Sequence, residues 1–184
     1  MRKIVLTFGI ISGVLMSVMM ILAIQLQDRL GSEHASFSYI IGYTIIVLSF
    51  LLVFFGIRSY RDEVGGGQIS FAKGFGVGIC ITLITCVFYV ASWEIIYFNF
   101  MHDFMDKYAA HIIDKARASG ASAAAIQVQI QKMQEMKRLY ENPFYNAALT
   151  FIEPFPVGLV ITLLSAAILR RKHRAPGLQT AEPI

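Results

Sequence analysis

The chain has 184 residues, of which 56% are hydrophobic and 15% charged, and its formal net charge is +4. A soluble domain of this length usually carries about a quarter charged residues, so the composition argues against an ordinary soluble protein. The deficit indicates a chain that is partly dissolved in lipid.

Four long apolar stretches predict membrane spans at residues 4–26, 37–57, 74–98 and 144–169. A helix needs about 20 apolar residues, at about 1.5 Å each, to cross a hydrocarbon core of about 30 Å. The first stretch is longer than the apolar region of a signal peptide, and no small-residue cleavage site follows it. We therefore interpret it as an uncleaved anchor.

Basic residues predict the orientation of the spans. Four spans place both ends of the chain on one side, and that side carries nine cations against three acids. The cations are Arg2, Lys3, Arg58, Arg61, Lys73, Arg170, Arg171, Lys172 and Arg174. Because basic residues stay in the cytoplasm, both termini are predicted to be cytoplasmic. The basic surplus indicates topology and contact with anionic lipid, and it gives no support to a nucleic-acid partner.

Small residues recur at helical spacing in every span and predict close helix packing. The glycines in this pattern are Gly9, Gly13, Gly42, Gly56, Gly74, Gly78 and Gly158. Packing within one bundle explains the pattern, and homodimerisation through one of these faces is the alternative.

Residues 99–142 form the longest segment outside the predicted spans, and they predict an amphipathic helical hairpin on the extracytoplasmic side. Apolar residues recur at helical spacing in both halves, with a stop glycine at Gly120 and a capping serine at Ser122 between them. The hairpin could stand on spans three and four or lie flat on the membrane. The lack of Gly or Pro between span three and Phe104 favours the standing arrangement.

Two acids lie inside the predicted spans, Glu94 and Glu153, and Pro154 and Pro156 follow the second of them. The prolines remove two backbone donors and are expected to break or restart the helix. In one interpretation, Glu153 ends a short outer helix and its carboxylate reaches water or free N–H groups. In the other, Glu94 and Glu153 face each other and share a proton or hold a cation.

Motifs for catalysis and for cofactor binding are missing from the sequence. The triple glycine at 65–67 lacks the GK[ST] ending of a phosphate-binding loop, and we interpret it as a flexible cytoplasmic turn. No nucleophile or zinc-protease signature occurs. His102, Asp106 and His111 do not share one helix face. The sequence therefore predicts no catalytic residues, no cofactor, no metal and no enzyme activity.

The segments GIRSYRD (56–62), GGGQISF (65–71), NPFYN (142–146) and FIEPFPVGLVITLLSAAILRRK (151–172) resemble a family of bacterial inner-membrane proteins called domain of unknown function 4199. Such a resemblance implies a small multi-span protein of the bacterial inner membrane. It carries no activity and assigns no functional residues.

These observations predict an all-α membrane protein with four transmembrane helices in a bundle and the hairpin between the third and fourth. We expect a single membrane domain at residues 1–174 and a flexible cytoplasmic tail at 175–184. The expected function is a non-enzymatic structural or partner-binding role in the inner membrane. A homodimer or an envelope protein bound through residues 99–142 is the expected partner, besides the lipid bilayer. The alternative is a small proton or cation transporter or channel that uses Glu94 and Glu153.

Overall fold

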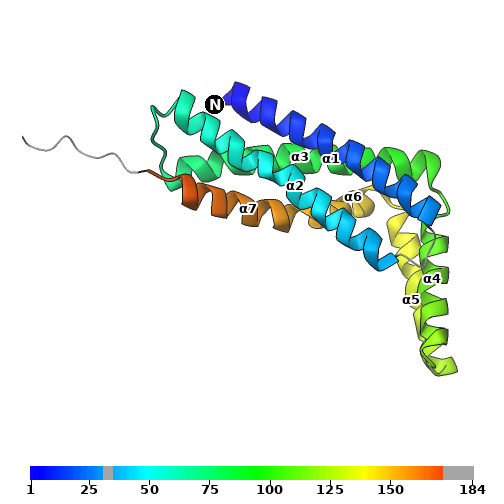
Figure 1. The fold of residues 1–184 in the computed structure, drawn as a ribbon. Helices are drawn as coiled ribbons and strands as arrows, with labels where there is room; N and C mark the ends of the chain where they lie inside the picture. Colours follow the sequence, from blue (N-terminus) through cyan, green and yellow to red (C-terminus); the bar gives the residue numbers. More distant parts are fainter. Residues whose placement is uncertain (31–34, 172–184) are drawn as a thin grey trace, which may run out of the picture. The chain divides into compact units, whose positions relative to one another are not determined.

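A computed structural model describes the backbone of residues 1–30 and 35–171, and the side chains of residues 1–25 and 41–171. Within these residues the chain is helical (Figure 1). Its helices are α1 (Arg2–Leu30), α2 (Ala35–Glu63), α3 (Phe71–Phe100), α4 (Phe104–Ala118), α5 (Ala123–Tyr140), α6 (Pro143–Ile152) and α7 (Pro154–Leu169). The predicted tail at 175–184 lies outside the described residues.

Four segments are long and apolar enough to cross a membrane, which confirms the prediction of an all-α membrane protein. They are Arg2–Gln25, Ile41–Glu63, Phe71–Phe100 and Pro143–Leu169, and the last combines α6 and α7. Their mean hydropathy is 1.9 to 2.4, yet only 33% to 39% of each apolar window is buried within the protein. Water does not tolerate so much exposed apolar surface on a monomer, whereas lipid does.

The chain divides into two compact units. The first contains Met1–Thr85 and the residues from Pro156 onward, and the second contains Cys86–Phe155. Helix α3 therefore contributes its first half to one unit and its second half to the other. The single membrane domain and the bundle of four complete spans stay predictions.

In the first unit, α1, α2, the start of α3 and α7 pack closely through small and hydroxylated residues. A Cβ atom added to Gly78 would lie 2.8 Å from side-chain atoms of both Ile57 and Thr162. Thr82 of α3 and Thr162 of α7 are fully buried, and their hydroxyl oxygens are 2.9 Å apart. The two hydroxyls therefore form a hydrogen bond with each other across the two helices. Ser12 of α1 donates to the backbone oxygen of Ser49 of α2 at 2.8 Å. Hydroxyls in an apolar interior join helices in this way because they have no water to bind.

The predicted packing glycines occupy different surroundings. A Cβ atom at Gly9, Gly56 or Gly158 would come within 3 Å of a neighbouring side chain, as at Gly78. At Gly74 it would make ordinary contact with Ala166 at 3.4 Å, and at Gly42 it would find no described residue within 4 Å. Gly13 is buried, and its backbone oxygen accepts a hydrogen bond from Ser17. Homodimerisation through a glycine face stays a prediction.

The triple-glycine turn between α2 and α3 has a defined conformation that requires glycine. Gly66 and Gly67 have φ angles of +59° and +82°, which side chains rarely adopt. A Cβ atom at Gly65 would collide with the backbone oxygen of Gln68. The turn closes α2 through a hydrogen bond from Gly67 N–H to the oxygen of Arg61. It then leads to Ile69, whose oxygen accepts from the N–H of Arg171 after α7.

The second unit contains the predicted hairpin as α4 and α5, which pack against each other. Gly120 has a φ angle of +76°, and the Ser122 side chain caps α5 by accepting from the N–H of Ala125, as the sequence predicts.

Helix α3 does not continue into the hairpin. Helix α3 ends at Phe100 and α4 begins at Phe104, although neither Gly nor Pro separates them. In one straight helix, Trp93 and Phe104 would be about 16 Å apart along the axis. Their ring centroids are 5.1 Å apart, so the chain turns back at residues 101–103 to make this contact. Aromatic packing therefore breaks the helix, and continuity gives no reason to prefer a standing hairpin.

Substitution of Gly158 by alanine is expected to destabilise the protein, because the new methyl group would lie 2.5 Å from Thr82 and 2.7 Å from the ring of Phe50. Both neighbours are fully buried and cannot withdraw, so overpacking costs about 1–3 kcal/mol. Gly42→Ala is the matched control, since it fills open space and gains helix propensity. Thermal unfolding in detergent, measured by loss of the monodisperse gel-filtration peak, compares them. Equal unfolding temperatures would contradict close packing at Gly158.

Candidate functional site

A buried polar cluster joins α3, α5 and α6 in the second unit. The indole N–H of Trp93 lies 3.0 Å from the Tyr140 hydroxyl oxygen and 3.1 Å from Oδ1 of Asn146, so its single hydrogen is shared between two acceptors. Oδ1 of Asn146 also accepts from the Thr150 hydroxyl at 3.1 Å. The Asn146 amide nitrogen donates to the backbone oxygen of Tyr140 at 3.3 Å. One fully buried side chain thus links three helices.

Local sequence places Asn146 at this point. Asn142 caps α6 by accepting from the N–H groups of Phe144 and Tyr145, and Pro143 follows it in the first turn, where a missing N–H costs nothing. Tyr140 ends α5, and two residues separate it from the start of α6. The short connection keeps the Tyr140 backbone oxygen within reach of the Asn146 side chain.

Aromatic rings surround this cluster. The ring centroid of Tyr140 lies 5.1 Å from that of Tyr97 and 6.4 Å from that of Phe104, and Trp93 packs edge-on against Phe104. The pair of Tyr140 and Phe104 is stacked and the other two are edge-to-face, and aromatic pairs of both kinds add to the stabilisation from buried area. Burial raises the pKa of the Tyr140 hydroxyl, whose oxygen accepts from the indole N–H of Trp93.

Beyond these aromatic rings, an ion pair and apolar side chains hold the two hairpin helices together. The Lys137 ammonium on α5 donates to the Asp106 carboxylate on α4 at 2.6 Å, and this hydrogen bond raises the pKa of Lys137. Met105 and Met133 are the buried side chains of α4 and α5. Two further pairs stay within α4, Lys107 with Asp103 and Arg117 with Asp114. Exposed pairs of this kind contribute little stability, and they leave most hairpin charges neutralised locally.

The stretch that contains Glu153, Pro154 and Pro156 lies where one helix ends and another begins. Helix α6 ends at Ile152 and α7 begins at Pro154, because a proline cannot donate to the preceding turn. Glu153 is exposed, and its carboxylate accepts a hydrogen bond of 2.8 Å from the Tyr89 hydroxyl on α3. A tyrosine therefore binds the carboxylate for which water or free backbone N–H groups were expected.

Glu94 lies on α3 next to Trp93, but it takes no part in the polar cluster. Its Oε1 atom is buried, and among the described residues it has no hydrogen-bond partner. Tyr89, which binds Glu153, lies five residues before Glu94 and thus about 140° around the helix. Direct contact between Glu94 and Glu153 is not observed among the described hydrogen bonds, and their shared role stays a prediction.

The sequence pattern did not predict the roles of Asn146, Tyr140 and Thr150 in the cluster, or of Tyr89 as the partner of Glu153. The ionisable residues in the spans drew attention to Glu94 and Glu153, whereas Asn146 is a neutral amide. A useful signal was available, since an asparagine inside an apolar span must find partners within the protein.

The described acidic and metal-ligating side chains do not form a metal site, and the hollow beside the cluster is apolar. In the described part of the chain, no three His, Cys, Asp or Glu side chains come close enough to hold a metal ion. A hollow of about 380 Å³ between α3 and α6 is lined by the apolar residues Val87, Val90, Ala91, Ala147, Ala148 and Phe151. Lipid tails suit such a lining better than ions do. The expected absence of enzyme activity, cofactor and metal stays a prediction.

The fold and this cluster define an all-α membrane protein. The sequence matches the family described as "Protein of unknown function (DUF4199)" over residues 7–171. The chain therefore belongs to this family, as the resemblance in four of its segments predicted. Among curated proteins and among solved structures, none matches the chain.

Substitution of Asn146 by alanine is expected to lower stability by about 1–3 kcal/mol, because it leaves the Thr150 hydroxyl and the Tyr140 backbone oxygen without their partner. Trp93 is the only tryptophan in the chain, so its fluorescence reports directly on this cluster during thermal unfolding. Asn99→Ala is the matched control, since Asn99 is exposed and binds only the carbonyl of its own preceding turn. If both variants unfold like the original protein, the cluster does not hold the three helices together.

Proposed function

We propose that the protein is a non-enzymatic component of the bacterial inner membrane that presents the hairpin of α4 and α5 to a protein partner. In this proposal both termini are cytoplasmic and the hairpin is extracytoplasmic, as the distribution of basic residues indicates. The partner is an envelope protein or a second copy of the chain.

The observation that carries this proposal is the attachment of the hairpin at its base. Tyr140 at the end of α5 is hydrogen-bonded to Trp93 of α3, and its backbone oxygen is bound by Asn146 of α6. Phe104 at the start of α4 packs against the same tryptophan. Both helices of the hairpin are therefore fixed where they leave the rest of the unit. A fixed base favours binding because less conformational freedom is lost when a partner engages the hairpin.

The part of the hairpin beyond its base offers a surface for contact. Val128 and Met136 of α5 keep 50% and 38% of their surface exposed, and they lie eight residues apart, on neighbouring sides of one helix. Exposed apolar residues on a helix outside the lipid favour contact with another protein.

A photo-crosslinking amino acid at Val128 is expected to capture a discrete partner in intact cells, while the same probe at exposed Leu164 of α7 captures lipid or nothing. A second variant replaces residues 114–129 by a short glycine-rich turn and keeps the fixed base. We expect it to retain the thermal stability and Trp93 fluorescence of the original protein, and to lose the partner captured from a probe at Met136. Capture that survives this deletion would contradict display by the hairpin.

The alternative function is proton or cation handling, and one observation favours it. The buried Oε1 atom of Glu94 has no hydrogen-bond partner among the described residues, and a carboxylate within a span is costly unless it has a role. In this alternative, purified protein in liposomes supports proton or cation flux, and Glu94→Gln abolishes it. Glu135→Gln, on the exposed face of α5, leaves it unchanged. Liposomes without flux would exclude the alternative and leave hairpin display untouched.

A further inference from the structure

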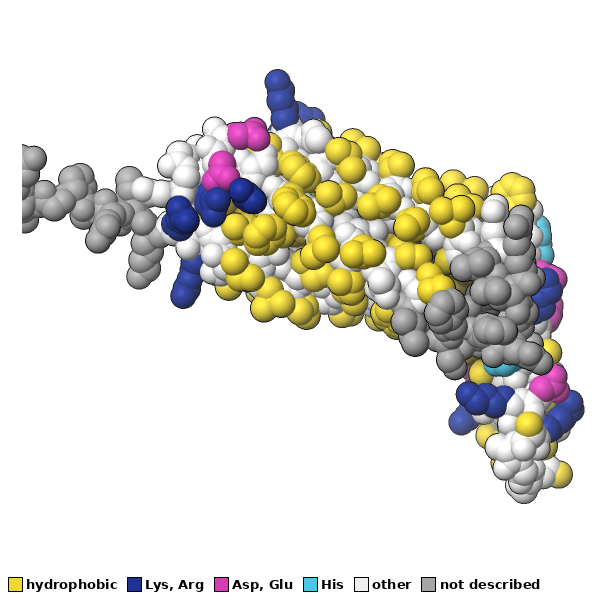
Figure 2. Space-filling model, in the orientation of Figure 1, with side chains coloured by type: hydrophobic (Ala, Val, Ile, Leu, Met, Phe, Trp, Pro, Cys, Tyr) yellow, Lys and Arg dark blue, Asp and Glu magenta, His cyan; other side chains and the backbone are white. Residues whose placement is uncertain are grey.

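One end of the first unit carries a strong excess of positive charge. Its described side chains include seven cations, Arg2, Lys3, Arg58, Arg61, Lys73, Arg170 and Arg171, against two acids, Asp62 and Glu63. Figure 2 shows basic side chains gathered at this end, beside a surface covered by hydrophobic residues. Like charges so close together repel one another unless an anion joins them.

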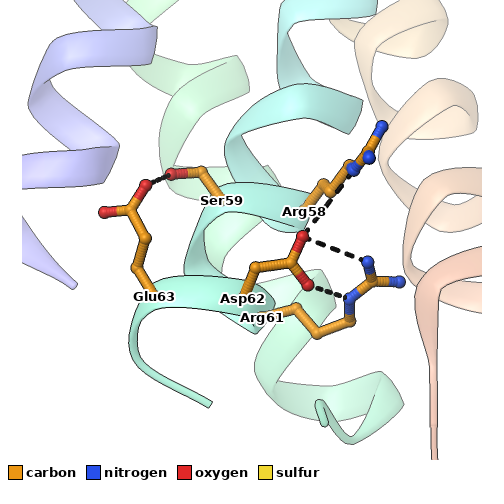
Figure 3. Close-up of polar contacts among 5 residues, drawn as sticks. All are labelled: Arg58, Ser59, Arg61, Asp62 and Glu63. Atoms are coloured by element: carbon orange, nitrogen blue, oxygen red, sulfur yellow. Dashed lines mark hydrogen bonds and ion pairs between the residues drawn. The ribbon is translucent and has the colours of Figure 1, made fainter. Parts of the chain in front are cut away.

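The acids at this end neutralise only part of the charge. The guanidinium of Arg61 binds Asp62 through two hydrogen bonds of 2.7 and 3.2 Å, and Arg58 approaches the same carboxylate at 3.7 Å (Figure 3). Glu63 accepts from the hydroxyl of Ser59 at 2.6 Å. Within the described residues, Arg2, Lys3, Lys73, Arg170 and Arg171 form no ion pair. The hairpin differs, because half of its cations are paired there.

The fold brings these cations together from separate parts of the chain. The hydrogen bond from the N–H of Arg171 to the oxygen of Ile69 joins the end of α7 to the glycine turn after α2. Arg171 is thereby close enough to interact electrostatically with Asp62, alongside Arg58 and Arg61. Ile69 is buried, which fixes the position of this connection. Two arginines thus contact the Asp62 carboxylate, and the connection through Ile69 brings the backbone of a third, Arg171, to the same end of the unit.

Exposed apolar side chains lie within three residues of Arg61, Ile69 and Arg171 in the sequence. Val64 in the turn, Phe71 at the start of α3 and Ile168 at the end of α7 keep 53%, 39% and 71% of their surface exposed. A molecule that satisfies both surfaces must carry a phosphate and a hydrocarbon chain together. One guanidinium group can donate two parallel hydrogen bonds to two oxygens of the same phosphate. Each further cation near an anionic membrane surface strengthens the attraction between the protein and the lipid headgroups.

We infer that Arg58, Arg61 and Arg171 form a headgroup site for an anionic phospholipid, whose acyl chains cover Val64, Phe71 and Ile168. Asp62 occupies part of the site as an internal counter-ion. This inference does not depend on the proposed role of the hairpin, since it concerns the other unit.

Native mass spectrometry of the full chain in detergent tests the site, with short-chain phosphatidylglycerol, short-chain phosphatidylcholine and inorganic phosphate as probes. We expect retention of phosphatidylglycerol over phosphatidylcholine, and none of phosphate. Equal retention of the two lipids would overturn the inference, and retention of phosphate alone would replace it by a plain anion site.

Variants separate this site from general charge attraction. Arg58→Gln with Arg171→Gln is expected to weaken phosphatidylglycerol binding about tenfold. Lys115→Gln with Lys132→Gln removes the same charge from the hairpin and is expected to leave binding unchanged. Asp62→Asn frees the arginines and is expected to strengthen it. Equal weakening by both double variants, or weaker binding by Asp62→Asn, would show that no headgroup site exists here.

Discussion

Helices whose outward faces are apolar must be surrounded by lipid, and this requirement governs the rest of the structure. About two thirds of each apolar window is not buried, so burial within the protein does not account for its hydrophobic side chains. Lipid cannot bind backbone groups, and therefore the spans are helical and satisfy their own hydrogen bonds. The hydrophobic effect holds the helices in the membrane, but it does not join one helix to the next.

Close contact and buried polar groups join the helices instead, and they act differently in the two units. In the first unit, glycines such as Gly78 and Gly158 bring helices together, and the Thr82–Thr162 pair links α3 to α7. In the second unit, Asn146 and Trp93 join α3, α5 and α6. Polar groups with no water nearby bind one another, so a few of them specify which helices meet.

The hairpin surface on α4 and α5 and the basic surface at the ends of α2 and α7 differ in how their charges are balanced. Half of the hairpin's cations are paired with acids of the hairpin, and exposed apolar residues of α5 lie beside them as a surface for a protein. At the end of α2 and α7, cations outnumber acids and border apolar side chains, a combination that suits a phospholipid. The first surface is fixed by an aromatic base and the second by the connection between Ile69 and Arg171.

The sequence by itself determined the four spans, the hairpin and its cap at Ser122, because each depends on residues close together in the chain. Tertiary structure decided the features that need distant residues to meet. Tyr89 and Glu153 are 64 residues apart, Trp93 and Asn146 are 53 apart, and their pairing follows from helix packing. The break before Phe104 has the same origin, since its ring packs on Trp93 and no local signal ends the helix there. Packing, which hydropathy and helical periodicity do not encode, therefore set the candidate site.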